Sequence, residues 1–464
     1  MPTNKTDTVI HHPLNRIALV SANTYRVPYP VYPLGVSYLA SYLSVHLPEI
    51  DLRLFDFNSG DDEEFARFLC EGSFDFVGIS LRNVDDVNIF EQNSFIAGYR
   101  RIMHIAREHT QAVIVVGGPG FSIFPELLFG ELNPDYGVRG EGEESLRGLI
   151  AALSEGRDAS RVEGLVYRDA KGSIRVNGRH SYLSAPTLHV DSQWADFYWE
   201  KSGMLNIQTK RGCPYRCVYC SYPVIDGRRV RTLDARTVVA NMEELHRSKG
   251  IDYLFFTDSI FNIHNEYDEE LARRMIESSV QIRWGAYFSP HNLTRERLEL
   301  FRQSGLTHIE FGSDSFSDRQ LENYNKMFRF GDILTQSRHC EDLGIFYAHF
   351  LILGGYGETD ATLDETFERS KELGRTVIFP FVGMRIYPET ALCDIALKEG
   401  IIGNVNELIN PVYYLSKNID ASSLETRAAA TGQKWIFPDS DSSEMIERFR
   451  ARKKRGPLWE YLRY

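Results

Sequence analysis

Three of the six cysteines lie close together in the chain, as Cys213, Cys217 and Cys220. Their spacing, C-x3-C-x2-C, has no fourth cysteine or histidine nearby, so a tetrahedral structural zinc site would lack a ligand. Three thiolates can instead hold a [4Fe–4S] cluster and leave one iron open to a small molecule. Thiols that act in redox sensing are the remaining alternative. The pattern therefore predicts an iron–sulfur centre with an exchangeable position.

The rest of the composition limits the class of protein. The chain has 464 residues, 43% hydrophobic and 25% charged, which is typical of folded domains. Its formal net charge of −12 gives no overall positive field for nucleic acid, and no apolar run approaches the length of a membrane span. We therefore expect a cytoplasmic protein without a disulfide framework, in which Cys70, Cys340 and Cys393 are small buried thiols.

Residues 16–153 alternate short β-branched runs with amphipathic segments, which is typical of a parallel sheet covered by helices on both faces. We predict a first, Rossmann-like α/β domain at 1–153 with a flavodoxin-like strand order. Its expected strands are Ile17–Val20, Asp51–Phe55, Phe76–Ser80, Val113–Val116 and Tyr136–Val138. Its expected helices are Leu34–Leu47, Asp62–Glu71, Gln92–Glu108 and Glu143–Leu153. Ligands of such sheets bind at the carboxyl ends of the strands.

A second alternating region covers residues 205–398, after a predicted hairpin, Val162–Asn177, and a linker within 154–204. Six strand-like runs with helices between them predict an incomplete TIM-type barrel, (β/α)6. The expected strands are Leu205–Thr209, Tyr253–Thr257, Arg283–Phe288, His308–Gly312, Phe346–Leu353 and Val377–Tyr387. The expected helices are Ala235–Arg247, Asp268–Ser278, Arg295–Ser304, Asp318–Asn325, Asp332–Leu343 and Thr362–Leu373.

The C-terminal segment, 399–464, has little periodicity. Its basic run from Arg448 to Arg455 is expected to form a solvated terminal helix. We expect this segment to help line a pocket, but for each single aromatic side chain the sequence favours core packing. The aromatic residues concerned are Tyr413, Tyr414, Trp435 and Phe437.

The cysteine motif follows the first predicted barrel strand, and Tyr219 stands before its third cysteine. In both respects the chain resembles the radical S-adenosylmethionine (SAM) superfamily. The resemblance implies that Cys213, Cys217 and Cys220 hold a [4Fe–4S] cluster, whose open iron chelates SAM. It further implies reductive cleavage of SAM to a 5′-deoxyadenosyl radical, with the electron coming from an external one-electron reductant such as flavodoxin or ferredoxin.

Short polar motifs after later barrel strands extend the resemblance. It implies that Asp258 contacts the methionyl ammonium of SAM, although the family's glycines are absent there. It places Ser313 and Asp314 against the ribose hydroxyls and the backbone at Arg385 against the adenine. Glu358, in Gly-Gly-Tyr-Gly-Glu-Thr, is expected to brace its loop instead of touching a ligand.

The glycine-rich loops of the first domain resemble those of the cobalamin-binding class of radical SAM enzymes. Because no D-x-H-x-x-G occurs, the implied cobalamin has no histidine ligand. The resemblance places its lower face free or near Asn83 and its tail along 117–121. The residues implied to bind it are Pro33, Leu34, Gly35, Asn83, Gly117, Gly118, Phe121, Gly140 and Glu141.

The resemblance favours a C-methyltransferase that uses two SAM molecules. One methylates cobalamin, and the other supplies the radical that activates an unactivated carbon of a small-molecule or lipid-like substrate. Radical rearrangement, cyclisation or oxidation without net methyl transfer is the first alternative, with or without cobalamin. A binding or sensor protein that keeps an idle cluster is another, and a first domain that binds lipid or substrate in place of cobalamin is a third.

Overall fold

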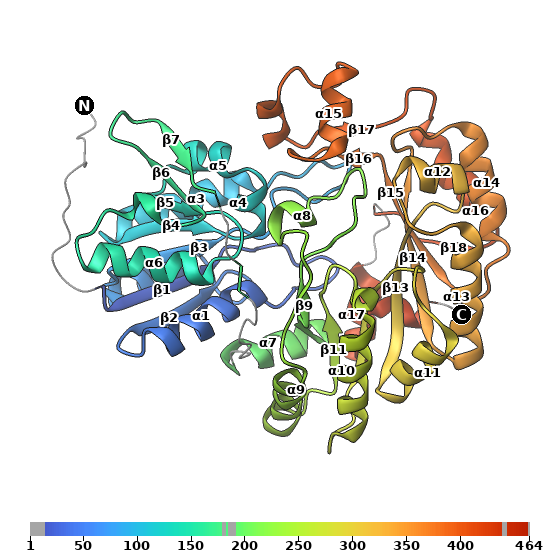
Figure 1. The fold of residues 1–464 in the computed structure, drawn as a ribbon, viewed down its shortest axis with the longest axis horizontal. Helices are drawn as coiled ribbons and strands as arrows, with labels where there is room; N and C mark the ends of the chain where they lie inside the picture. Colours follow the sequence, from blue (N-terminus) through green and yellow to red (C-terminus); the bar gives the residue numbers. More distant parts are fainter. Residues whose placement is uncertain (1–13, 179–181, 184–191, 439–442, 463–464) are drawn as a thin grey trace. The chain divides into compact units, whose positions relative to one another are not determined.

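The computed structural model describes residues 14–178, 182–183, 192–438 and 443–462 (Figure 1). The chain divides into two compact units, and each is considered by itself. The first contains Met1–Tyr25, Pro33–Val84 and Phe95–His189, and the second contains Arg26–Tyr32, Asp85–Ser94 and Val190–Tyr464. Two short segments of the N-terminal half are therefore part of the second unit, which sequence patterns did not predict.

The first unit is built on a sheet in the order β2-β1-β3-β4-β5-β6-β7. Its strands are β1 (Arg16–Ser21), β2 (Asp51–Asp56), β3 (Phe76–Ser80), β4 (Val113–Gly117), β5 (Tyr136–Val138), β6 (Leu165–Arg168) and β7 (Ile174–Val176). The first five are parallel and have the flavodoxin-like order, as predicted. The predicted hairpin forms as β6 and β7, but it extends this sheet, because β6 pairs antiparallel with β5.

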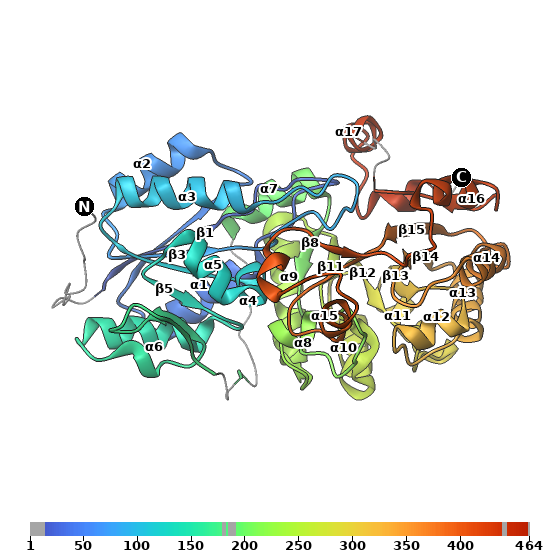
Figure 2. The same cartoon turned by 90° about the horizontal axis from the view of Figure 1, so that it is seen from above.

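Helices cover both faces of the first sheet. They are α1 (Leu34–His46), α2 (Asp62–Gly72), α3 (Ile96–His109), α4 (Pro119–Ile123), α5 (Pro125–Leu132) and α6 (Glu143–Ser154), with the short η1 (Ala159–Arg161). α1 contacts α6 and α2 contacts α3, and Figure 2 shows α2 and α3 on one face with α6 on the other. Two helices were not predicted. α4 begins at Pro119, whose fixed φ suits a first helical turn, so part of the expected glycine loop is helical.

The second unit contains a parallel, seven-stranded open barrel in the order β18-β15-β14-β13-β12-β11-β8. Its strands are β8 (Leu205–Ile207), β11 (Tyr253–Phe256), β12 (Arg283–Phe288), β13 (Leu306–Asp314), β14 (Phe346–Leu353), β15 (Val377–Val382) and β18 (Lys434–Trp435). Two small pairs accompany it: β9 (Lys210–Arg211) with β10 (Arg231–Thr232), and β16 (Met384–Arg385) with β17 (Tyr413–Tyr414). The six predicted strands are present. The last one breaks at Gly383, where φ is +68°, and β18 is too short to give a sequence signal.

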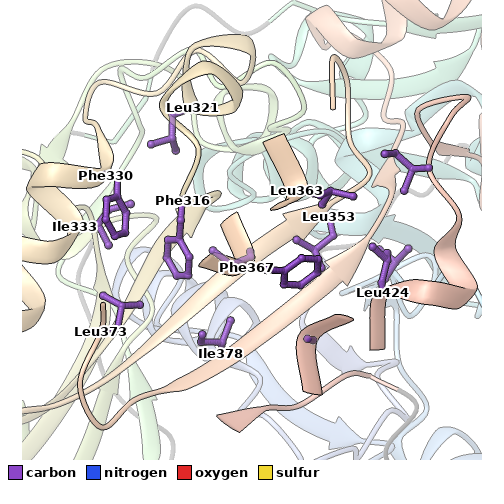
Figure 3. Packing of buried hydrophobic residues seen from close by; sticks show 14 of the residues in the cluster. Phe316, Leu321, Phe330, Ile333, Leu353, Leu363, Phe367, Leu373, Ile378 and Leu424 are labelled. Carbon is purple, nitrogen blue, oxygen red and sulfur yellow. The ribbon is translucent and has the colours of Figure 1, made fainter. Parts of the chain in front are cut away.

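Helices alternate with these strands. They are α7 (Ser192–Ser202), α8 (Tyr222–Ile225), α9 (Ala235–Lys249), α10 (Asn265–Glu277), α11 (Arg295–Gln303), α12 (Asp318–Asn323), α13 (Phe330–Leu343), α14 (Asp360–Ser370), α15 (Ala391–Lys398), α16 (Leu424–Ala429) and α17 (Ser443–Ala451). The short helices are η2 (Phe261–Ile263), η3 (Val405–Ile409), η4 (Ala421–Ser423) and η5 (Leu458–Tyr461). Figure 3 shows the apolar layer between the sheet and α13, α14 and α16, with Phe330, Phe367 and Leu424 among its members. This layer fixes the strands whose ends form the candidate site. In the described part of the chain, no helix is long and apolar enough to cross a membrane.

The C-terminal segment differs from the expected solvated helix. The Arg455 guanidinium lies 4.2 Å from the centre of the Trp199 ring and donates to the Trp199 carbonyl at 2.7 Å. Farther on, Trp459 Nε1 donates to Glu310 Oε1 on β13 at 2.9 Å. The segment is therefore an integral part of the second unit.

Candidate active site

The three cysteines lie on a loop between β9 and α8 that backbone hydrogen bonds hold at several points. Cys213 N donates to Gly227 O at 3.1 Å, Val218 N donates to Tyr324 O at 3.3 Å, and Leu392 N donates to Val218 O at 2.8 Å. Gly212 precedes the first cysteine with φ +87°, and a Cβ there would lie 2.1 Å from the carbonyl oxygen of Arg229. Only glycine fits this turn. The loop is thus positioned by its neighbours before any ligand binds.

All three cysteines line one cavity of about 490 Å³ in the second unit. Burial raises the pKa of each thiol, that of Cys220 to about 12. Among the described residues, no three His, Cys, Asp or Glu side chains are placed to hold a single metal ion. A cubane cluster, by contrast, offers a separate iron to each thiolate, so its ligands do not need to converge on one point.

The cavity walls are mostly apolar and aromatic. Four large apolar side chains that remain exposed, Val87, Tyr222, Tyr287 and Met327, all line it. Exposed apolar surface gathered at one hollow indicates a binding site. The aromatic residues predicted from the C-terminal segment do not line it: Trp435 and Phe437 pack on the hydrophobic layer of Figure 3, and Tyr414 donates to Glu399 at 2.8 Å. Trp435 and Phe437 thus have the core-packing role that the sequence favoured for each single residue, and β18 places Trp435 at the sheet edge.

Asp314 and Tyr219, both predicted site residues, meet at this cavity. Tyr219 OH donates to Asp314 Oδ2 at 2.5 Å, and Lys326 Nζ lies 2.7 Å from the same oxygen. Asp314 has φ +60°, in the left-handed region that a non-glycine residue seldom adopts. Lys326 was not predicted, because it follows α12 without a motif and only the folded chain places it beside Asp314 and the cysteines.

Asp258 does not line the cavity, and its predicted contact with the methionyl ammonium stays a prediction. Its side chain is fully buried beneath the cysteine loop. Oδ1 accepts hydrogen bonds from the backbone N–H groups of Thr209 and Lys210 at 2.7 and 3.0 Å, and Oδ2 accepts one from Lys210 Nζ at 2.9 Å. The neighbouring Ser259 lines the cavity instead. Asp258 therefore anchors the start of the cysteine loop.

Ser313 and Arg385 also have structural partners. Ser313 is fully buried and does not line the cavity, and its hydroxyl bonds His349 Nδ1 at 2.8 Å, so its predicted ribose contact stays a prediction. The Arg385 guanidinium pairs with buried Asp85 at 2.8 Å and donates to Leu408 O at 2.7 Å. β16 nevertheless forms part of the cavity wall, which leaves the predicted role of its backbone as a proposal.

Glu358 braces the loop after β14, as the sequence predicts. Its Oε2 accepts from Gly354 N at 3.1 Å and from Tyr324 OH at 3.4 Å, and its Oε1 accepts from Thr362 Oγ1 at 2.9 Å. Burial raises the pKa of Glu358 from 4.5 to about 7, despite these hydrogen bonds, which lower it. The carboxyl group is thus protonated in the folded chain over a pH range in which it is ionised in the unfolded chain.

This difference predicts a pH dependence of stability. Between pH 4.5 and 7 the unfolded chain loses the Glu358 proton while the folded chain keeps it, so the free energy of unfolding should fall as pH rises. With about 1.4 kcal/mol for each pKa unit, the fall amounts to at most about 3 kcal/mol. Glu358→Gln should remove this slope in urea unfolding, whereas exposed Glu372→Gln should keep it. An unchanged slope in Glu358→Gln would contradict the prediction.

In the first unit, the loops after β1, β3, β4 and β5 leave one edge of the parallel sheet. Gly118 has φ +93°, and a Cβ there would lie 2.7 Å from Leu81 O, so glycine lets the loops after β3 and β4 pack together. Gly35 is exposed at the start of α1 with open space around it. Gly140 N donates to Ser122 Oγ at 2.8 Å. The predicted residues on these loops, Pro33, Leu34, Asn83, Gly117 and Glu141, thus lie along one edge.

Two side chains at this edge refine the prediction. Phe121 is fully buried, and a Cβ at Gly137 would lie 2.4 Å from its ring, so its side chain packs in the core, while its predicted place along the cofactor tail stays a prediction. Asn23, in the loop after β1, is also buried. Its Nδ2 has no hydrogen-bond partner among the described residues. A buried amide without a partner calls for an acceptor from a ligand or a water molecule.

Comparison with family models decides the identity of both units. Residues 20–150 match the B12 binding domain, and residues 207–369 match the Radical SAM superfamily. The chain belongs to the radical SAM enzymes that carry a B12-binding domain. The family models confirm the predicted family and fold and, in their descriptions, name two of the three predicted cofactors.

This radical SAM enzyme is similar to relatives of two kinds. It is 26% identical over 444 residues to a tryptophan 2-C-methyltransferase of Streptomyces laurentii, covering 81% of this chain and 73% of the relative. It is 26% identical over 286 residues to an anaerobic magnesium-protoporphyrin IX monomethyl ester cyclase of Rubrivivax gelatinosus, covering 59% of this chain and 51% of the relative.

A solved structure is similar over nearly the whole chain. The radical SAM methyltransferase TsrM of Kitasatospora setae, with cobalamin and a [4Fe–4S] cluster bound, superposes with a TM-score of 0.85 at 22% identity, covering 97% of both chains. At this identity the likeness supports the fold alone. The roles of individual residues therefore depend on the geometry of this radical SAM enzyme itself.

Proposed function

We propose that this enzyme transfers a methyl group from SAM to an unactivated carbon of a small, largely apolar substrate, with cobalamin as methyl carrier. The observation that carries the proposal is one apolar cavity of about 490 Å³, lined by all three cysteines, in a chain that also has a B12-binding domain. The proposed metal centre and the proposed substrate pocket would then share this one cavity.

The donor set fits a [4Fe–4S] cluster held by Cys213, Cys217 and Cys220, since three thiols face one cavity and the described residues that line it include no fourth cysteine and no histidine. When bound, the cluster would supply one electron to the SAM sulfonium, and cobalamin would carry the methyl group. The chain's own residues orient and enclose these groups. Tyr219 and Lys326 fix Asp314 at the cavity wall, where its free oxygen is proposed to accept a hydrogen bond from SAM.

Cobalamin is proposed to bind at the loop edge of the first unit. Its amide side chains are acceptors suited to the buried Asn23 Nδ2, and the exposed Gly35 leaves open space at the start of α1. Gly117, Gly118, Gly140 and the other predicted loop residues would give their backbone to the cofactor tail, while Phe121 would support the loop from beneath. None of the described residues proposed here to bind the cofactor is a histidine.

The cavity wall supports a substrate without a strong net charge. Its charged lining side chains are Asp314, Lys326 and Arg385, and each is paired: Asp314 with Lys326, and Arg385 with Asp85. Tyr287, Phe350 and Phe381 add apolar area. An unpaired charge on the substrate would find no partner there, so desolvation would disfavour its binding.

The test is anaerobic reconstitution with iron, sulfide and hydroxocobalamin, followed by incubation with SAM carrying a CD3 group, a reductant and candidate substrates. We expect retained corrin bands, and a product 17 mass units heavier than the substrate, from replacement of H by CD3. We also expect S-adenosylhomocysteine and 5′-deoxyadenosine as co-products. Corrin retention without label in any product, alongside turnover of a substrate, would contradict methyl transfer.

Radical rearrangement, cyclisation or oxidation is the second candidate, favoured by the match to the magnesium-protoporphyrin IX monomethyl ester cyclase. Such a reaction would use the same two cofactor-binding units, but it needs no methyl carrier. Its signature is 5′-deoxyadenosine formed with substrate turnover and without S-adenosylhomocysteine. The ratio of these two co-products therefore separates the candidates.

A further inference from the structure

The cysteine loop has a second accessible face. Cys217 and Cys220 line not only the large cavity but also a separate cavity of about 320 Å³, together with Arg216, Arg228 and Glu389. None of the aromatic wall residues Tyr287, Phe350 and Phe381 lines this second cavity, which we call the outer cavity. Two cluster ligands can thus be approached without passing through the substrate pocket.

Three exposed arginines stand at the outer cavity: Arg216 and Arg228 in its wall and Arg229 next in sequence. None of them forms an ion pair with a described residue. The Arg228 guanidinium donates to the Tyr215 carbonyl at 3.2 Å, which holds it against the cysteine loop. The acidic side chains here are Glu389 in the wall and Asp226 in the same turn. The arginines thus give a local positive excess in a chain whose formal net charge is −12.

We propose that the surface formed by Arg216, Arg228 and Arg229 around the outer cavity docks a small, acidic one-electron carrier protein. This inference depends on the proposed function, because it assumes that the three cysteines hold the cluster. In the step, one electron leaves the carrier and enters the cluster; the carrier is oxidised, the cluster is reduced, and no bond forms or breaks.

The charges favour this occupant over another. Exposed charge of opposite sign steers encounter between proteins and raises association rates by about 10- to 1,000-fold. The rest of this acidic chain repels an acidic carrier, so productive encounters would concentrate at the arginines. Because the docking face and the substrate pocket are separate cavities, the carrier and the substrate would not compete.

The test measures cluster reduction directly by stopped-flow absorbance, with reduced flavodoxin as the carrier and dithionite as a small-molecule reductant. The variant is R216E/R229E, because neither side chain bonds a described residue whose loss would disturb the loop. We expect reduction by flavodoxin at low salt to slow at least about tenfold, with dithionite reduction and iron content unchanged. R216K/R229K should retain most of the rate.

The matched control is R302E/R338E, which makes the same charge change at exposed positions on α11 and α13. It should leave the flavodoxin rate within about twofold of the wild type, since these helices do not line the outer cavity. An R216E/R229E rate equal to wild type, or an equal loss in the control, would overturn the proposal. Methyl transfer is not part of this readout. If flavodoxin reduces the cluster as expected but no product is methylated, only the proposed function is contradicted.

Discussion

Cys217→Ala is expected to reduce 5′-deoxyadenosine formation to the background of cluster-free protein. Cys217 lines both cavities at the cysteine loop, and two remaining thiolates would leave the cluster short of a ligand. The reconstituted variant should also lose the broad iron–sulfur absorption near roughly 400 nm. Anaerobic assay with SAM and dithionite, together with iron analysis, measures both effects on the same sample.

The control for this substitution is Cys70→Ala. Cys70 is exposed on α2 in the first unit, with its sulfur 3.6 Å from His109 Nδ1, so the change removes a thiol far from the cysteine loop in sequence. It should retain wild-type iron content and 5′-deoxyadenosine formation. Persistent 5′-deoxyadenosine formation by Cys217→Ala would refute the assignment of the cluster ligands. It would also refute the proposal that the cavity lined by the three cysteines is the active site.

Lys210→Met should lower the free energy of unfolding by about 3–5 kcal/mol, the range for removing one partner of a buried ion pair. Lys210 Nζ lies 2.9 Å from Asp258 and 3.0 Å from Asp268, with all three side chains at most 1% exposed. Burial lowers the pKa of Lys210, but the two carboxylates raise it further, so that the ammonium stays charged. Methionine would leave both carboxylates without it, and only Arg297 would still face Asp268.

Urea unfolding measures this effect, with Lys249→Met as the matched control. Lys249 pairs with Asp196 at 2.6 Å near the surface, where an ion pair contributes about 1 kcal/mol or less. The Lys210 variant should also bind less iron, since the same Asp258 holds the backbone at the start of the cysteine loop. Equal losses of unfolding free energy in the two variants would contradict the inference that the buried ion pairs of Lys210 with Asp258 and Asp268 anchor the cysteine loop.

Local sequence patterns were sufficient for the main parallel strands of both sheets and their order. Strands such as Phe346–Leu353 are buried on both faces and read as nearly continuous apolar runs, so their positions could be predicted from composition alone. The cysteine spacing likewise predicted an iron–sulfur centre, because the loop that carries the three cysteines is short. Cys340 and Cys393 are buried as expected, whereas Cys70 is exposed because it lies on the outer face of α2.

Side-chain direction within the site was not predictable in this way. Asp258 follows β11, and Ser313 and Asp314 end β13, yet of these three only Asp314 lines the cavity. The residues at a strand end turn toward either face, and packing decides which: a buried lysine draws Asp258 beneath the loop, and His349 draws Ser313 toward the helices. Family motifs name the position but not the direction of its side chain.

The sequence by itself determined the two α/β units, their strand order and the three-cysteine motif, since these depend on short-range periodicity and spacing. Only the tertiary structure decided which polar groups meet. Lys326 with Asp314, Asp85 with Arg385, and Lys210 with two aspartates join residues between 12 and 300 positions apart in the chain. Such pairs form where burial makes an unpaired charge unfavourable, and burial is a property of the folded chain.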